Sequence, residues 1–206
     1  MSQIALFVIT WSAILIAVTA AARQMPAEIS NRTLYPLLAK PLSRWEFLLG
    51  KFVGVNLMCL FSLVVLYAIF LIVAWRAGTM PGWIVAQNFY LRFLSLALLV
   101  AMTLFLSLLL THAANVCLSL LLAIGASTFS TALSLVHDKL SGLQLRLAEA
   151  LYFTLPHLDL FNLNGKVVHG WEPVAAWVLV YLTLYALGYI AQLLGAAGLL
   201  LQRRML

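Results

Sequence analysis

Hydrophobic residues run through this chain in long segments that polar residues interrupt at only a few places. A segment of about 20 apolar residues is long enough for one helix to cross a bilayer. The 48 residues from Phe89 to Val136 would form ~72 Å of helix, more than twice the hydrocarbon thickness, so they are divided into two spans near Thr111 to Asn115. The pattern therefore predicts about five membrane-spanning helices, over residues 4–22, 47–75, 90–111, 115–136 and 174–201.

The polar stretch at residues 23–46 separates the first two predicted spans and contains helix signals of its own. Thr33 can cap a short helix that has Pro36 in its first turn, and Pro41 ends that helix. Ser43 and Glu46 have the spacing of a capping box, which restarts a helix at about Arg44. The stretch is therefore interpreted as a short amphipathic helix at the membrane surface, a break, and a new span.

Charge orients these elements. The stretch around the first loop carries more basic than acidic residues, namely Arg32, Lys40, Arg44 and Lys51 against Glu28 and Glu46. Loops rich in Lys and Arg near span ends face the cytoplasm. Arg203 and Arg204 follow the last span in the same way. The prediction is an outside N-terminus, a cytoplasmic C-terminus, and a loop at residues 76–88 on the outer side.

Composition supports the same class of protein. Hydrophobic residues make up 65% of the chain and charged residues 9%, with a mean hydropathy of +1.06. An average soluble domain carries about 25% charged residues, so this is an all-α, polytopic integral membrane protein with one transmembrane domain over residues 1–206. The net charge of +6 lies in loops and at the C-terminus and does not indicate nucleic-acid binding. Cys59 and Cys117 both fall in apolar runs, which indicates neither a disulfide nor a thiolate metal site.

The outer segment at residues 137–173 is the second informative region. Leucines at helical spacing predict an interfacial amphipathic helix over residues 141–154. Histidine and aspartate also gather on this side, and His157 and Asp159 with one further ligand would be needed for a catalytic metal site. The spacings match no compact motif, and no Walker loop or Ser-His-Asp pattern occurs. We predict no catalytic, cofactor-binding or metal-binding residues, and a metalloenzyme stays a third hypothesis.

Two further features bear on packing and substrate. Gly50 and Gly54 form a G-x-x-x-G at the inner end of the second span, which lets another backbone approach closely, either within this chain or from a second copy. Arg92 begins the third span near the outer surface. We expect its side chain to extend to the lipid headgroups, with contact to an anionic substrate as the alternative.

The residues around the first loop carry a family resemblance. They are Glu28, Ile29, Arg32-Thr33-Leu34-Tyr35, Leu37-Leu38-Ala39-Lys40-Pro41, Ser43-Arg44, Phe47-Leu48-Leu49-Gly50-Lys51 and Gly54. This run resembles the permease subunits of ABC transporters of the type-2 exporter family, most of all the branch associated with maturation of multi-copper enzymes. Such permeases usually have an interfacial helix and one more span before the segment that starts here, and this chain is expected to lack them.

The resemblance implies a function and two sites. It implies a permease subunit in the cytoplasmic membrane of a bacterium or archaeon, working as a homodimer or heterodimer with a separate ATPase that binds ATP and Mg. The first loop would be the coupling helix, and its docking surface would comprise Glu28, Arg32, Thr33, Leu37, Lys40, Pro41, Ser43 and Arg44. The outer segment would act as a gate, with Pro156, His157, Asp159 and Asn162. The alternative is a non-transporting membrane scaffold that recruits a cytoplasmic protein through the same loop.

Overall fold

The computed structural model describes residues 2–30, 44–78, 82–136, 142, 156–169 and 171–204. Every regular element among these residues is helical, which confirms the predicted all-α fold. The elements in chain order are α1 (Ser2–Ser30), α3 (Arg44–Arg76), α4 (Trp83–Ser107), α5 (His112–Val136), η2 (Leu158–Phe161), α7 (Asn164–His169) and α8 (Ala176–Arg204).

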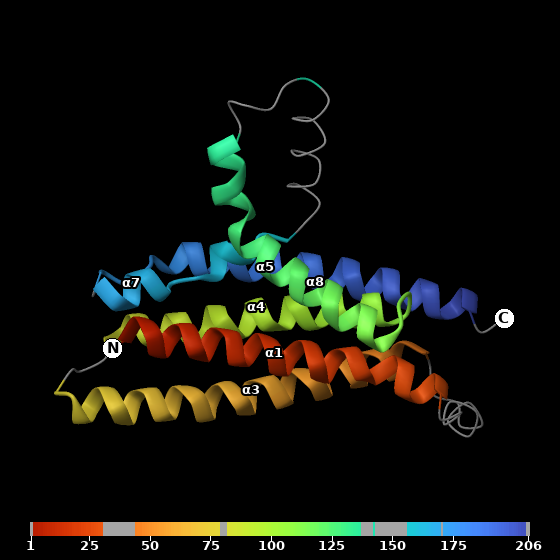
Figure 1. Cartoon of the computed structure of the whole chain (residues 1–206), viewed down its shortest axis with the longest axis horizontal. Coiled ribbons are helices and arrows are strands. Elements are labelled where there is room, and N and C mark those ends of the chain that lie inside the picture. The colour runs from red at the N-terminus through yellow and green to blue at the C-terminus, as the bar shows by residue number, and fades with distance from the viewer. Residues whose placement is uncertain are drawn as a thin grey trace.

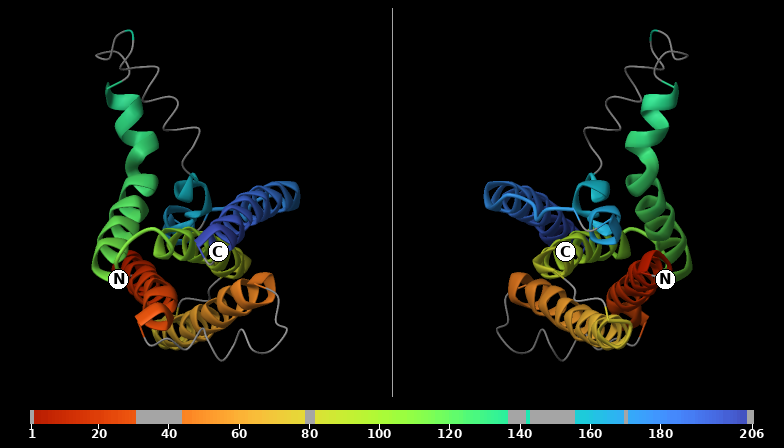
Figure 2. Two further views of the ribbon diagram at one scale, coloured as in Figure 1. Left: turned by 90° about the vertical axis from the view of Figure 1, so that its right-hand side faces the viewer. Right: turned by 90° about the vertical axis from the view of Figure 1, so that its left-hand side faces the viewer.

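Helix α4 forms the centre of a bundle in which α1, α3, α4 and α8 run side by side (Figure 1). It packs against α1, α3, α5 and α8. Within the most apolar 18 residues of α4, 72% of the residues are buried, whereas the corresponding share in α3 is 17%. The end-on views show α1, α3, α5 and α8 arranged around α4 (Figure 2). Polar side chains on α4 are therefore enclosed by protein on most sides, whereas most of α3 faces outward.

Apolar packing holds the bundle together in two clusters. One joins α4 to α8 and η2 through buried residues that include Leu91, Leu98, Phe161 and Ala186. The other joins α1, α3 and α4, and on α1 it contains Ala13, Ala17 and Ala21 at intervals of four residues. Small side chains in one row let membrane helices approach closely, so α1 can lie tightly against both neighbours.

Among the described residues, four helices are long and apolar enough to cross a membrane: Gln3–Gln24, Trp45–Arg76, Trp83–Ser107 and Ala176–Leu201. They overlap four of the five predicted spans, and the protein is a multi-pass membrane protein. The remaining span, at 115–136, coincides with α5, a 25-residue helix whose side chains are described over His112–Gly125. The C-terminal part of α5 turns away from the bundle (Figure 1), so a fifth span stays a prediction.

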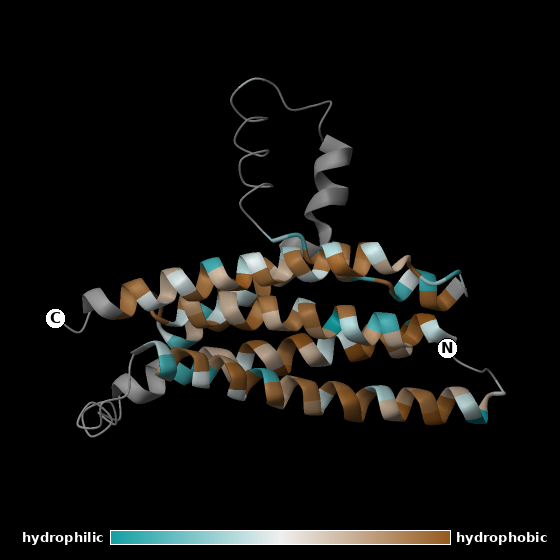
Figure 3. Cartoon of the chain, turned by 180° about the vertical axis from the view of Figure 1, so that it is seen from behind, coloured by the Kyte–Doolittle hydropathy of each residue, from teal (hydrophilic) through white to brown (hydrophobic). Residues whose placement is uncertain are grey.

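The largest differences from the predicted helix boundaries occur at the end of α1 and the start of α4. Helix α1 continues past Ala22 to Ser30, into the predicted coupling loop. Helix α4 begins at Trp83, so Gln87 and Asn88, assigned to the preceding loop, lie inside the helix. Along the bundle, apolar residues dominate the middle and hydrophilic residues gather toward the two ends (Figure 3). The predicted helix at 141–154 lies outside the described residues, Gly142 excepted.

Candidate functional site: an outer segment held against α4

The described part of the outer segment runs from Pro156 through η2 and α7 and reaches α8 through residues 171–175. Helix η2 packs against α4 and α5, and α7 packs against α1 and α4. Phe161 is fully buried and Leu158 nearly so, which fixes the middle of the segment in the apolar core. The segment therefore covers the end of the bundle where α1, α4 and α8 begin (Figure 1).

Arg92 of α4 connects the core of the bundle to this segment. Its Nη2 donates to Oδ1 of Asn162 at 3.2 Å and to Oδ1 of Asn164 at 3.4 Å. The side chain is only 4% exposed. The expectation that Arg92 extends to the headgroups was wrong, because the outer segment lies over the guanidinium and supplies amide oxygens to it.

Asn88, one helical turn before Arg92, extends this polar cluster. Its Nδ2 donates to the hydroxyl of Tyr67 on α3 at 3.0 Å and to Oδ1 of Asn164 at 3.1 Å. The amide of Asn164 in turn donates to Oγ1 of Thr10 on α1 at 3.1 Å. One side chain at the start of α7 thus connects to α1 and α4, and through Asn88 to α3.

The two ends of the outer segment have separate attachments. Near its start, the hydroxyl of Tyr185 on α8 lies 3.1 Å from the backbone nitrogen of His157 and 3.0 Å from its ring Nδ1. Near its end, the amide of Gln87 donates to the carbonyl of Val174 at 2.9 Å and accepts from its N–H at 2.8 Å. The segment is therefore held at three places by side chains of α4 and α8.

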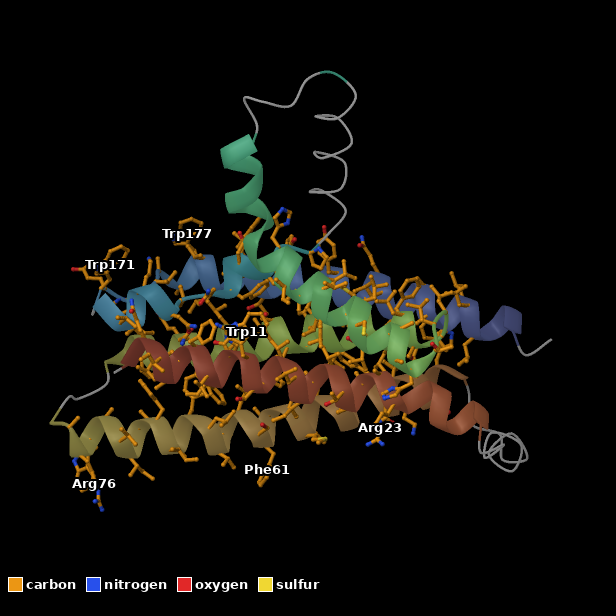
Figure 4. The ribbon with its side chains drawn as sticks, viewed as in Figure 1. Trp11, Arg23, Phe61, Arg76, Trp171 and Trp177 are labelled. Atoms are coloured by element: carbon orange, nitrogen blue, oxygen red, sulfur yellow. The ribbon has the colours of Figure 1, made fainter. Side chains whose placement is uncertain are left out.

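Aromatic and basic side chains mark the two ends of the bundle. Trp171 and Trp177 point away from the helices at the end where Arg76 lies, and Arg23 lies toward the other end (Figure 4). Both tryptophans are largely exposed. Tryptophan is enriched where a bilayer meets water, so this placement suits these residues as interface anchors. It also places Arg76 and Arg23 at opposite ends, as the predicted topology requires.

Comparison with known proteins identifies the kind of membrane protein. Residues 2–204 match the family model described as ABC-2 family transporter protein. The chain belongs to the ABC-2 transporter family. ABC-2 permeases are the membrane components of transporters that normally work with a cytoplasmic ATPase subunit, and they are not ATPases themselves. The comparisons with curated proteins and with solved structures found no match.

The predicted gate residues of this ABC-2 permease lie together on the outer segment. Pro156 is buried, and His157 contacts Tyr185 as described above. The carboxylate of Asp159 accepts a hydrogen bond from the backbone N–H of Leu160 at 3.1 Å, within η2. Asn162 accepts from Arg92 and from the backbone N–H of Asn164. The structure places these residues at the bundle end, and their role as a gate stays a prediction.

The predicted coupling surface falls mostly outside the described residues, which omit Arg32, Thr33, Leu37, Lys40, Pro41 and Ser43. For Glu28 and Arg44 the structure describes the backbone, at the end of α1 and the first position of α3. Helix α3 begins at Arg44, the position at which the sequence predicts a helix start. Gly50 and Gly54 are exposed on α3, and a Cβ at either would meet no described atom within 4 Å.

Most of the cluster around Arg92 was not predicted from the sequence. Gln87, Asn88 and Arg92 are polar residues in a largely apolar helix, and the spacing of four between Asn88 and Arg92 places them on one face. This signal was present, but the helix start had been placed too late to use it. Tyr67 and Tyr185 carried no such signal, since aromatic residues are common throughout apolar spans.

The third hypothesis, a metal centre, gains no support from the described part of the chain. It contains no group of three or more His, Cys, Asp or Glu side chains that could hold a metal ion. The ring of His157 lies against Tyr185, with ring centroids 6.4 Å apart. The arrangement at this end of the bundle is instead a set of neutral amides and hydroxyls around one guanidinium.

Proposed function

We propose that this chain is the membrane subunit of an ATP-driven exporter, with a partner ATPase that binds ATP and Mg at the cytoplasmic loop. The observation that carries the proposal is the match to the ABC-2 transporter family over residues 2–204. Two copies of the permease, or one copy and a related chain, would form the passage, with the N-terminus outside the cytoplasmic membrane. The run from Glu28 to Gly54 favours the branch associated with multi-copper enzymes.

The outer segment at 156–175 is suited to act as the gate. A few side-chain hydrogen bonds from α4 and α8 attach it, and each typically contributes about 0.5–1.5 kcal/mol net. Bonds of this strength can be exchanged when two helices shift, whereas the buried Phe161 keeps the middle of the segment in place. ATP-driven closure of the ATPases would move the permease between states in which these bonds are made and broken.

A contact at the other end of the bundle supports a route for coupling. Trp45, in the last residues of the coupling loop and next to Arg44 of the predicted docking surface, packs over Gly198 of α8. Thirteen residues earlier, at ~20 Å along the same helix, Tyr185 holds His157 of the outer segment. A displacement of α3 by the ATPase would therefore reach the gate through α8.

Affinity purification in mild detergent tests whether a partner ATPase binds this chain. The test variant is Arg44→Glu. We expect a stoichiometric P-loop ATPase to accompany the native chain and to be lost from Arg44→Glu and from Arg32→Glu, because charge reversal repels a surface complementary to the loop. Both variants should still insert in the membrane. ATPase-stimulated transport should fall to background in both.

Arg76→Glu is the matched control, because Arg76 is exposed at the opposite end of the bundle. It should leave ATPase recovery and transport unchanged. Unchanged recovery and transport in both loop variants would refute the coupling surface. Recovery of an enzyme complex without any ATPase would favour the scaffold alternative.

A further inference from the structure

Arg92 is buried at an unusual depth for a charged residue. It lies nine positions after Trp83, the first residue of α4, or ~14 Å along the helix. A charged side chain within a membrane protein is costly unless it is paired, and such residues usually mark functional pathways. At 4% exposure, water cannot supply the missing solvation.

The charge of Arg92 has no opposite charge beside it within the described chain. The carboxylates whose side chains are described are Glu46, Asp159 and Glu172, and none of them forms an ion pair with Arg92. Its hydrogen-bond acceptors are the neutral amide oxygens of Asn162 and Asn164. Tyr67, also neutral, lies next to it. Neutral oxygens compensate a buried cation less well than an anion does.

The guanidinium also has an unused donor. Nη2 makes both hydrogen bonds, whereas Nε is buried and has no partner among the described residues. Nε and Nη2 together form one edge of the guanidinium, and that edge matches the two oxygens of a carboxylate or phosphate. Oδ1 of Asn88 is likewise buried without a described partner. Of these two open groups, Nε is the one that an oxyanion would fill, because an oxyanion offers acceptors and not donors.

We propose that Arg92 binds one oxyanion group, a carboxylate or a phosphate, which displaces the Asn162 and Asn164 oxygens from the guanidinium and takes the amide N–H of Asn88 that now donates to Asn164. The exchange replaces two neutral acceptors with a charged one at Nε and Nη2. Because Asn162 and Asn164 flank the end of η2 and the start of α7, their release loosens the outer segment. Binding of the oxyanion and opening of the gate are thus the same exchange of hydrogen bonds.

If the proposed transport function holds, on which this step rests, the oxyanion belongs to the exported substrate, or to a lipid headgroup that enters from the side. Both ligands present the same oxyanion group, so the first measurement asks whether Arg92 binds an oxyanion at all. The second asks whether free phosphate or a phospholipid is the better ligand.

The test uses the full chain purified in neutral detergent, with inorganic phosphate added at constant ionic strength. Phosphate should raise the thermal unfolding midpoint saturably, because a ligand that binds only the folded state stabilises it. Arg92→Gln should weaken the apparent affinity roughly 10- to 100-fold, as expected for lost hydrogen bonds to a charged group. Arg76→Gln, the same change at an exposed arginine, should bind as the native chain does.

Asn162→Ala gives a second, opposite outcome. It removes an acceptor that competes with the oxyanion, so phosphate should bind several-fold more tightly. If Arg92→Gln does not fold, the phosphate affinity of Asn162→Ala tests the site by itself. Equal phosphate affinity in native and Arg92→Gln protein would overturn the proposal, and so would unchanged or weaker binding in Asn162→Ala.

A parallel arm replaces phosphate with phosphatidylglycerol in phosphatidylcholine nanodiscs. The quantity compared is the rise in the thermal unfolding midpoint that depends on Arg92. A larger rise with phosphatidylglycerol than with phosphate assigns the site to a lipid headgroup. A larger rise with phosphate assigns it to a free oxyanion. Both arms use the isolated chain without an ATPase. If the unfolding midpoint shifts in an Arg92-dependent way but no ATPase co-purifies, the site is upheld and the exporter function is rejected. If an ATPase co-purifies but the midpoint shift does not depend on Arg92, only the site is rejected.

Discussion

At the scale of single residues, the contact between Trp45 and Gly198 depends on the absence of a side chain. A Cβ at Gly198 would lie 2.5 Å from Cη2 of Trp45 and 2.7 Å from two further ring atoms. Real Cβ atoms do not approach so closely, so any larger residue must displace the ring. Trp45 is 38% exposed and can be displaced, but it then loses its packing on α8.

Gly198→Val should therefore destabilise the protein by roughly 1–3 kcal/mol, the usual cost of overpacking a tight contact. Thermal unfolding in detergent would measure the loss. Gly188→Val, on the same helix where nothing lies within 4 Å, should change stability much less. Combining Trp45→Ala with Gly198→Val should remove most of the penalty of the valine. Equal effects of the two glycine variants would show that the ring does not constrain position 198.

At the scale of elements, α4 and α8 hold the outer segment by different means. Helix α4 presents Gln87, Asn88 and Arg92 to the segment from one end of the bundle, and α8 presents the hydroxyl of Tyr185. The tyrosine hydroxyl contacts both the backbone nitrogen and the ring Nδ1 of His157, which attaches the start of the segment to α8. Removing the hydroxyl of Tyr185 tests this attachment without changing the shape of the core.

Tyr185→Phe should speed hydrogen exchange of the backbone around His157 to Phe161 several-fold, since losing one hydrogen bond costs about 1 kcal/mol and RT is about 0.6 kcal/mol. Mass spectrometry of the corresponding peptides would measure the change. Tyr181→Phe, one turn earlier on α8 and 64% exposed, is the control and should leave these peptides unchanged. Identical exchange in both variants would mean that the apolar anchor at Phe161 alone holds this part of the segment.

At the scale of the whole molecule, the outward face of α3 is available to lipid or to a second copy. Apolar side chains on it are exposed, including Leu57, Phe61 and Val64, and Phe61 points away from the bundle (Figure 4). Gly50 and Gly54 lie near the start of the same helix with no described atom within 4 Å of where a Cβ would be. Among the described helices, then, none uses this G-x-x-x-G for packing within the chain, which favours an intermolecular contact.

Gly54→Ile should reduce dimer formation in detergent by at least several-fold while leaving the stability of the monomer nearly unchanged, because the added atoms meet only another molecule. Analytical ultracentrifugation would give the dimerisation constant, and thermal unfolding would give the stability. Gly188→Ile adds the same side chain at an exposed position of α8 and should not affect dimerisation. A dimer lost in Gly188→Ile and retained in Gly54→Ile would place the interface on α8.

The sequence by itself determined the class of the protein and the spans of α1, α3, α4 and α8, within several residues at their ends. Helix length in a bilayer depends on the run of apolar residues, which is a local property, and the start of α3 at Arg44 was predicted from a local spacing of four residues, Ser43 to Glu46. The family resemblance in the run from Glu28 to Gly54 was local as well, and it anticipated the family that the whole chain matches.

Only the tertiary structure decided which polar residues meet. Arg92 and Asn162 are separated by 70 positions, and Trp45 and Gly198 belong to the second and the last of the long helices. A guanidinium in an apolar run can reach the headgroups or turn inward, and the choice depends on what covers it. Here the outer segment covers it and supplies amides, so a residue expected at the membrane surface became the centre of the candidate site. No local pattern contains that information, because it arises from the packing of segments that are distant in the chain.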